Sequence, residues 1–291
     1  MGLEITRPFF MINFNGEILL DDHKYLNHNN RGLKYGDALF ETIRVVNGSI
    51  FFWEDHYLRL MASMRILRMQ IPMDFTMEFL EEQILNTVEA NELSNAPARI
   101  RLTVFRNDGG LYTPTTNEIS YVIEATTLAS PFYVLQEENY EVELFKDFYV
   151  TAGLLSTIKT NNKLVNVVGS VFAKENDYQN CLLLNEKKMV VEALNGNLFL
   201  VKGHVIKTPP KQDGCLNGII RKRLLAILEK IEDYEVQETS ISPFELQKAD
   251  ELFITNSIAG IQPITKYRKK SYTNNVAKNL IGKLNAAARL N

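Results

Sequence analysis

Two Asn-Gly pairs, each between apolar runs, most constrain how this chain can fold. Asn15-Gly16 divides "FFMINF" from "EILL", and Asn47-Gly48 divides "ALFETIRVV" from "SIFFW". Asn-Gly favours the two-residue turn whose twist matches that of paired antiparallel strands. We therefore expect two hairpins in the N-terminal third. Hydrophobic periodicity adds helices over about residues 55–68 and 76–91, and strands in "RIRLTVF" and "ISYVIEATTL".

The remainder of the chain mixes strands and helices in the same way. A strand in "YEVELFKDF" is followed by four short segments, "CLLLN", "MVVEAL", "NLFLVKG" and "HVIKTP", which predict a meander. Helices are expected in "NGIIRKRLLAILEKI", after the capping box "SPFE", and over residues 277–290, with a buried strand in "ELFITN". We expect an α+β fold with domains at residues 1–128 and 135–291, and a linker at 129–134 that contains "ASPF".

Composition excludes several classes of function. The chain has 291 residues and a net charge of -3, without a long basic run, which argues against nucleic-acid binding. No apolar run reaches membrane-spanning length. Cys181 and Cys215 form no CxxC pattern, and the four histidines show no metal-ligand spacing. We expect reduced cysteines, a cytoplasmic location, no membrane contact and no metal site.

A lysine stands where an extended run gives way to a predicted helix, in "STIKTNNKLVNVV". Cap-type residues follow Lys159, and the apolar pattern then restarts with helical spacing from Leu164. The Lys159 side chain is therefore expected to point out of a strand-to-helix junction. It is either an ordinary surface lysine or a nucleophile.

Four features of the second domain fit one ligand. They are Lys159; Glu192, a carboxylate that is costly to bury within "MVVEAL"; the glycine-containing helix start in "CLNGII"; and the hydroxyl and amide groups of "ITNS". A ligand with an amine-reactive carbonyl, a cationic ring nitrogen and a phosphate would use all four, and pyridoxal 5'-phosphate has these groups. Each feature taken singly is more often purely structural.

Six motifs in order carry a resemblance to a known family. They are "RGLKYGDALFETIR", "HYLRLMASMRIL", "IKTNNKL", "VVEALNGNLF", "TPPKQDGCLNGIIR" and "ADELFITNSIAGIQPI". In this order and spacing the chain resembles the class-IV, or fold-type IV, pyridoxal-phosphate enzymes. That family includes branched-chain aminotransferases, D-amino-acid aminotransferases and aminodeoxychorismate lyases.

The resemblance implies a cofactor site in the cleft between the two domains of a homodimer. Lys159 is then the lysine that bonds to the cofactor aldehyde, Glu192 pairs with the ring nitrogen, and Arg59 contacts the phosphate. Tyr35 and Arg101 would line the substrate pocket, with Arg101 suited to a carboxylate. The other implied cofactor contacts are Leu216 on the ring face, the backbone of Gly218, Ile219 and Ile220, the Thr255 hydroxyl, and Asn256.

Departures from the family pattern leave the reaction open. Ile220 stands where threonine is frequent, Lys163 stands where branched-chain aminotransferases have tyrosine, and "FETIR" replaces their "FEGIR". The first interpretation is transfer of an amino group from a branched-chain-like amino acid to a 2-oxo acid. The alternative is an aminodeoxychorismate lyase that releases pyruvate and 4-aminobenzoate. A third is a non-catalytic protein that holds the cofactor, against which the intact Lys159 and Glu192 count.

Overall fold

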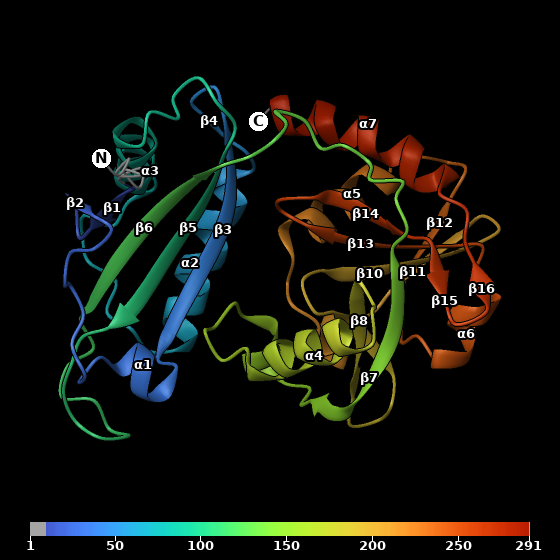
Figure 1. Ribbon diagram of the computed structural model, residues 1–291, viewed down its shortest axis with the longest axis horizontal. Coiled ribbons are helices and arrows are strands. Elements are labelled where there is room, and N and C mark those ends of the chain that lie inside the picture. Colours follow the sequence, from blue (N-terminus) through green and yellow to red (C-terminus); the bar gives the residue numbers. More distant parts are fainter. Residues whose placement is uncertain (1–9, 291) are drawn as a thin grey trace, which may run out of the picture. The chain divides into compact units, whose positions relative to one another are not determined.

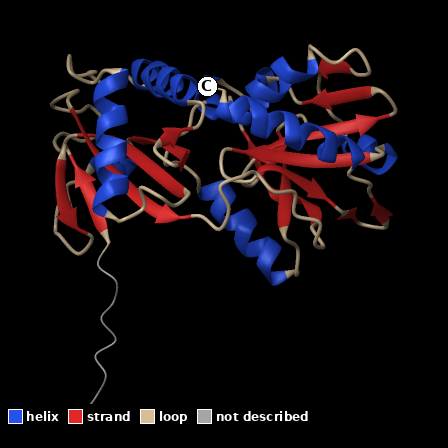
Figure 2. Ribbon diagram, turned by 90° about the horizontal axis from the view of Figure 1, so that it is seen from above, coloured by secondary structure: helices blue, strands red, loops and turns tan. Residues whose placement is uncertain are grey.

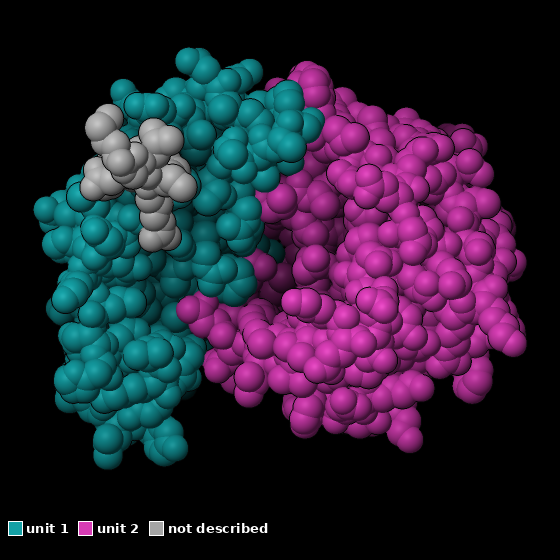
Figure 3. All heavy atoms as spheres, in the orientation of Figure 1, with its two compact units in different colours: residues 1–131 teal, residues 132–291 magenta. Residues whose placement is uncertain are grey.

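The chain forms two compact units, Met1–Pro131 and Phe132–Asn291, which Figure 3 colours separately. The computed structural model describes residues 10–290. The boundary lies within residues 129–134, where the sequence predicts a linker. Figure 2 shows helices and strands in both units, which is the mixed composition expected of an α+β chain. In the described range, no helix is both long enough and apolar enough to cross a membrane.

Unit 1 is built on one antiparallel sheet with the strand order β2-β1-β6-β5-β3-β4 (Figure 1). Its strands are β1 Met11–Phe14, β2 Glu17–Leu20, β3 Ala38–Val46, β4 Ser49–Ile50, β5 Ala98–Arg106 and β6 Ile119–Thr127. Both predicted hairpins are confirmed, because β1 pairs with β2 and β3 with β4 across the Asn-Gly turns. Asn15 and Asn47 adopt φ of 53° and 49°, as this turn type requires.

Helices α2 Trp53–Ile66 and α3 Met77–Ala90 contact this sheet, and the short helix α1 Arg31–Tyr35 precedes β3. The Thr76 side chain caps α3 by accepting the N–H of Phe79. The central strands β3 and β5 are buried along most of their length, and each of α2 and α3 has one buried stripe. These core residues include Leu39, Ile43, Ile100, Leu102 and Ile123 from the sheet, and Leu60, Met64, Leu80 and Ile84 from the helices.

Unit 2 contains two five-stranded sheets, with the orders β16-β15-β7-β8-β9 and β12-β11-β10-β13-β14. The strands of the first are β7 Glu141–Val150, β8 Asn180–Asn185, β9 Val190–Ala193, β15 Lys266–Tyr267 and β16 Lys270–Ser271. Those of the second are β10 Asn197–Lys202, β11 Val205–Thr208, β12 Glu235–Glu238, β13 Glu251–Asn256 and β14 Gly260–Ile264. Side chains of both sheets share one core, which includes Leu144, Leu182, Leu198 and Ile254.

The helices of unit 2 are α4 Leu164–Glu175, α5 Ile219–Leu228, α6 Pro243–Lys248 and α7 Asn275–Arg289. Helix α4 packs against β7 and β8 through a second apolar cluster that contains Phe145 and Leu183. The predicted capping box is confirmed at α6, where Ser242 and Glu245 satisfy each other's backbone N–H groups.

Two sequence expectations need correction. The predicted meander is interrupted, because β8 and β9 belong to one sheet whereas β10 and β11 belong to the other. The chain changes sheets at a tight turn, which a bridge between Ala193 and Gly196 closes. The run before Lys159 is also not extended to its end, since β7 stops at Val150 and a 3₁₀ helix, Leu154–Thr157, follows.

Candidate active site

Lys159 lies in the connection between the 3₁₀ helix Leu154–Thr157 and α4. Its neighbours Ile158 and Thr160 are buried, whereas Lys159 itself is half-buried. The N–H of Asn217 donates to the carbonyl oxygen of Thr157 over 3.0 Å. This hydrogen bond fastens the Lys159 segment to the loop that leads into α5.

Glu192 is buried in β9, as the apolar surroundings in the sequence predict. Its Oε2 accepts the N–H of Leu216 at 2.9 Å and lies 3.5 Å from Nδ2 of Asn197. Burial raises the pKa of Glu192, while the Leu216 N–H and the charges of Lys163 and Lys159 act in the opposite direction. An amine and a buried carboxylate are therefore electrostatically coupled within unit 2.

The start of α5 is shaped for an anion. Gly218 is the N-cap residue and has no side chain to receive the first-turn N–H groups of Ile219 and Ile220. The Asn197 side chain fills the space beside it, because a Cβ at Gly218 would lie 1.9 Å from Asn197 Oδ1. Nδ2 of Asn197 also donates to Leu216 O over 2.9 Å, so only glycine fits at the cap.

Thr255 lies opposite Asn197 in the pairing of β10 with β13. Its hydroxyl is buried and has no hydrogen-bond partner among residues 10–290. A buried hydroxyl without a partner is costly unless a ligand completes it. Asn256 follows, and its Oδ1 accepts the N–H groups of Ile258 at 3.0 Å and Ala259 at 2.8 Å, so this side chain orders the turn after β13.

These groups fit pyridoxal 5'-phosphate. Lys159 supplies an amine for the aldehyde, Glu192 a carboxylate for the ring nitrogen, and the α5 start with Thr255 supplies donors for the phosphate. When bound, the cofactor supplies an aldehyde that captures amines and a ring that accepts electrons. Over the described residues, no group of three or more His, Cys, Asp or Glu side chains is arranged to hold a metal ion.

Arg59 lies on α2 of unit 1, where it forms a buried ion pair with Glu41 of β3. Arg59 Nε donates to Oε1 of Glu41 over 2.8 Å, a second guanidinium nitrogen contacts Oε2, and His56 Nδ1 lies 2.7 Å from Oε2. Burial alone would raise the pKa of Glu41, but Arg59 and His56 outweigh it and lower that pKa to about 2. The carboxylate therefore fixes the orientation of the guanidinium predicted to contact the phosphate.

Arg101 lies on β5 of unit 1, with its guanidinium 3.9 Å from the centre of the Phe40 ring and 4.0 Å from Glu124. Partial burial lowers the pKa of Arg101; Glu124 opposes that change and Arg99 adds to it. Tyr35 ends α1, and the Arg31 guanidinium lies 4.9 Å from the centre of its ring. Both side chains thus have neighbours that restrict their positions.

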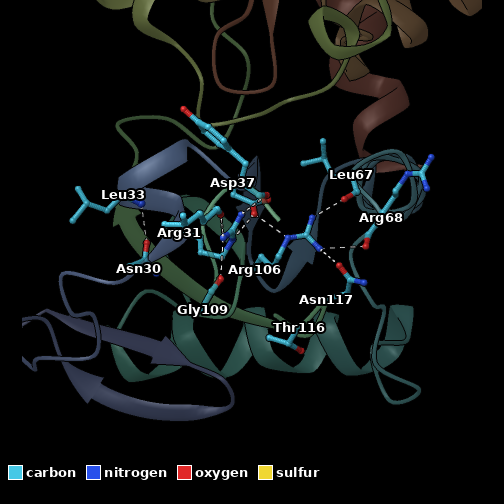
Figure 4. A network of polar contacts seen from close by, with 12 residues as sticks. Asn30, Arg31, Leu33, Asp37, Leu67, Arg68, Arg106, Gly109, Thr116 and Asn117 are labelled. Atoms are coloured by element: carbon cyan, nitrogen blue, oxygen red, sulfur yellow. Dashed lines mark hydrogen bonds and ion pairs between the residues drawn. The ribbon is translucent and has the colours of Figure 1, made fainter. Parts of the chain in front are cut away.

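A polar network centred on Asp37 holds the loop after β5 (Figure 4). Asp37 Oδ2 accepts Nε of Arg31 and Nε of Arg106, each over 2.9 Å. Arg31 also donates to the carbonyl oxygens of Gly109 at 2.9 Å and Leu111 at 2.6 Å. The loop beside Tyr35 is thereby tied to α1.

Unit 2 contains most of the predicted cofactor residues: Lys159, Glu192, Leu216, Gly218, Ile219, Ile220, Thr255 and Asn256. Arg59, Tyr35 and Arg101 belong to unit 1. The roles of all eleven remain predictions. Sequence reasoning missed Asn197, which resembles an ordinary turn residue in "ALNGNLF". It also missed Glu41, although this carboxylate is surrounded by apolar residues in "LFETIRVV" much as Glu192 is.

Comparison with known proteins defines the class of the chain. A family model described as "Amino-transferase class IV" matches residues 38–267, so the chain belongs to the class-IV aminotransferases. This family uses pyridoxal 5'-phosphate, and both the fold and the cofactor expected from the sequence are confirmed at that level.

Individual relatives include both reaction types. A putative branched-chain-amino-acid aminotransferase of Methanocaldococcus jannaschii is 32% identical over 87% of this chain and 86% of its own. An aminodeoxychorismate lyase of Vibrio harveyi is 26% identical over 81% of this chain and 84% of its own. The branched-chain aminotransferase of Thermoproteus uzoniensis, solved with norvaline, shares the fold with a TM-score of 0.84, 24% identity, and coverage of 95% of this chain and 93% of that one.

Proposed function

We propose that the chain is an aminotransferase that moves an amino group from a branched-chain-like amino acid to a 2-oxo acid. The observation that carries this proposal is the buried Glu192 carboxylate, which accepts the N–H of Leu216 in the loop leading into α5 and lies in the same unit as Lys159. The similarity to the branched-chain enzyme of M. jannaschii supports the choice of substrate.

Each predicted residue then has a task. The Lys159 amine would hold the cofactor through its aldehyde and would move the proton at the substrate Cα. Glu192 would stabilise positive charge at the ring nitrogen, and Leu216 would pack against the ring. The first-turn N–H groups of α5, the Thr255 hydroxyl and Arg59 hold the phosphate. Arg101 binds a substrate carboxylate and Tyr35 lines the substrate pocket.

The lyase reaction is the second candidate because of Lys163. Its backbone is the N-cap of α4, its side chain is half-buried, and its charge acts on Glu192. A cation at this position differs from the tyrosine of branched-chain aminotransferases. Similarity to the lyase of V. harveyi also favours this alternative. A non-catalytic role as a cofactor-holding protein has less support, since both Lys159 and Glu192 are present.

A product assay separates these candidates. The purified protein is incubated with L-leucine and 2-oxoglutarate, and separately with aminodeoxychorismate. Formation of glutamate in the first mixture supports the aminotransferase, whereas pyruvate and 4-aminobenzoate in the second support the lyase. Borohydride reduction and peptide mapping test the lysine, since we expect the pyridoxyl label on Lys159. A label on Lys163 or Lys174 contradicts the assignment.

We also propose a homodimer and a cytoplasmic location. The first rests on the family, and the second is supported by the free, buried thiols of Cys181 and Cys215. Light scattering of the purified protein tests the dimer, and a mass near 33.3 kDa would contradict it, since that is the mass of one chain. Fractionation of the source cells tests the location, and recovery outside the cytoplasmic fraction would contradict it.

A further inference from the structure

The first residues of unit 2 are fastened to its last helix. The Tyr133 N–H donates to Asn285 Oδ1 over 2.9 Å, and Asn285 Nδ2 donates back to the Tyr133 carbonyl oxygen over 2.9 Å. Beside them, the Arg289 guanidinium stacks 3.9 Å from the centre of the Phe132 ring. Figure 1 shows the segment that enters unit 2 running alongside α7. These contacts hold the backbone of Tyr133 in place independently of its side chain.

The Tyr133 side chain reaches the turn between β13 and β14. Its hydroxyl donates to the carbonyl oxygen of Ser257 over 3.2 Å. Its ring covers Gly260, because a Cβ at that position would lie 2.6 Å from Cγ of Tyr133. Gly260 also has a φ of +71°, which favours glycine on its own account. The buried tyrosine thus occupies the space that a side chain at residue 260 would need.

This turn begins directly after Thr255, whose buried hydroxyl has no hydrogen-bond partner in the described part of the chain. Asn256 orders the turn from within, through the N–H groups of Ile258 and Ala259. Tyr133 holds the turn from outside, through a hydrogen bond to the Ser257 carbonyl oxygen and through packing of its ring on Gly260. The end of β13 is therefore fixed by two side chains, one local and one that arrives from the start of unit 2.

We propose that Tyr133 is a positioning residue for the phosphate end of the cofactor site, acting through the turn Asn256–Gly260 on Thr255. The inference rests on the proposed role of Thr255 in phosphate binding. Loss of the Tyr133 hydroxyl should loosen the turn and weaken the binding of ligands that carry a phosphate. Binding that depends only on the aldehyde and the ring should remain unchanged, because Glu192 is held by Leu216 and Asn197 and not by this turn.

A second tyrosine offers a matched control. The Tyr272 hydroxyl donates to the carbonyl oxygen of Leu246 over 2.6 Å, in the same unit but at α6. Tyr272→Phe therefore removes the same kind of hydrogen bond as Tyr133→Phe, without touching the turn after β13. A purely structural role of Tyr133 predicts the same behaviour from both variants.

The experiment compares the wild-type protein, Tyr133→Phe and Tyr272→Phe after removal of the cofactor. Calorimetric titration gives the dissociation constants of pyridoxal 5'-phosphate and of pyridoxal, which lacks the phosphate. For Tyr133→Phe we expect the constant for pyridoxal 5'-phosphate to rise about 3- to 10-fold, the effect of one net hydrogen bond. The constant for pyridoxal should stay within about twofold of the wild-type value, and Tyr272→Phe should change neither by more than about twofold.

Several results would overturn the inference. An equal loss of affinity for both ligands in Tyr133→Phe would show a general structural effect, as would identical behaviour of the two tyrosine variants. An unchanged affinity for pyridoxal 5'-phosphate in Tyr133→Phe would show that the hydroxyl does not position the turn. Failure of the wild-type protein to bind pyridoxal 5'-phosphate would instead reject the proposed function, and the inference with it.

Discussion

The N–H of Leu216 donates to Oε2 of Glu192 over 2.9 Å, which joins β9 to the loop that precedes α5. One carboxylate oxygen thus orders the segment that leads into the proposed phosphate site. The same side chain is buried, with a pKa raised above that of a free glutamate. A buried carboxylate destabilises the folded protein when it has no partner of opposite charge, and its burial becomes favourable once a cation lies beside it.

Glu192→Gln should retain the cofactor and lose turnover. The amide oxygen can still accept the Leu216 N–H, so the loop keeps its anchor, but a neutral amide cannot hold positive charge at the ring nitrogen. We expect kcat to fall by on the order of 100-fold or more, with cofactor absorbance preserved. Glu186→Gln is the control, because this exposed carboxylate also accepts a backbone N–H, that of Ala152 at 3.2 Å. Near-normal kcat in Glu192→Gln would contradict the role.

The raised pKa of Glu192 also predicts how the cofactor-free protein responds to pH. A carboxyl group with a raised pKa binds its proton more tightly in the folded state, so its contribution to stability declines as pH rises through its folded pKa. Glu192→Gln should lack this decline. Thermal unfolding of both cofactor-free proteins, from about pH 4 to about pH 8, measures this decline in stability. Parallel curves of melting temperature against pH for the two proteins would contradict a buried, titrating carboxylate.

Glu41→Gln should destabilise unit 1 in a pH-dependent manner. Arg59 and His56 outweigh burial and lower the Glu41 pKa from 4.5 to about 2, so its contribution is fully present above about 4.5 and lost as pH falls towards about 2. We expect a loss on the order of 3 kcal/mol at neutral pH, measured by urea unfolding. Glu124→Gln removes an ion pair at 4.0 Å in which the carboxylate is half-exposed, and should cost under about 1 kcal/mol. Equal losses would refute the buried pair.

Lys163→Tyr tests the choice between the two reactions. An ammonium stabilises a nearby cofactor phenolate more strongly than a neutral hydroxyl, since charge-assisted hydrogen bonds are about twice as strong. The pKa at which the absorbance of the bound cofactor changes should therefore be about one unit higher in the variant. The ratio of transamination to pyruvate release should also change. Lys174→Tyr, at the exposed end of α4, is the control. Superimposable titrations and unchanged products would exclude Lys163 from reaction choice.

Gly218→Ala should disturb the cap of α5. The new Cβ would lie 1.9 Å from Asn197 Oδ1, so Asn197 must move and release Leu216. We expect cofactor affinity to fall on the order of 10-fold, because a buried hydrogen bond is displaced. Combination with Asn197→Ala should cost less than the sum of the single changes. Gly282→Ala, where a Cβ would meet nothing within 4 Å, should leave affinity unchanged. Strict additivity would contradict the steric coupling.

Local chemistry explains what the sequence predicted well. Asn-Gly turns and the capping box at Ser242 each act within a few residues, so their signals are readable along the chain. The burial of Glu192 was predictable because its neighbours are apolar. The same argument applies equally to Glu41, which Arg59 and His56 satisfy, so a buried carboxylate alone does not identify a cofactor site.

Long-range contacts explain what was missed. Tyr133 and Asn285 are 152 positions apart, and no periodicity reports such a pair. The change of sheets after β9 also depends on packing of two sheets around one core, which short strands do not encode individually. Helix α1 has only five residues, too few to display helical spacing.

The hydrogen bond from Asn217 to Thr157 limits where this chain can change its length. It joins two segments at the backbone, so no side-chain substitution can adjust it. An inserted residue between Thr157 and Lys159, or between Gly214 and Gly218, would shift the amine relative to the α5 start. The exposed turn at residues 186–188 meets the segment before Lys159 through a side chain, that of Glu186 on the Ala152 N–H, and can accept insertions because a side chain can adjust. Length variation among functional descendants of this chain should therefore collect at that turn and be absent beside Lys159.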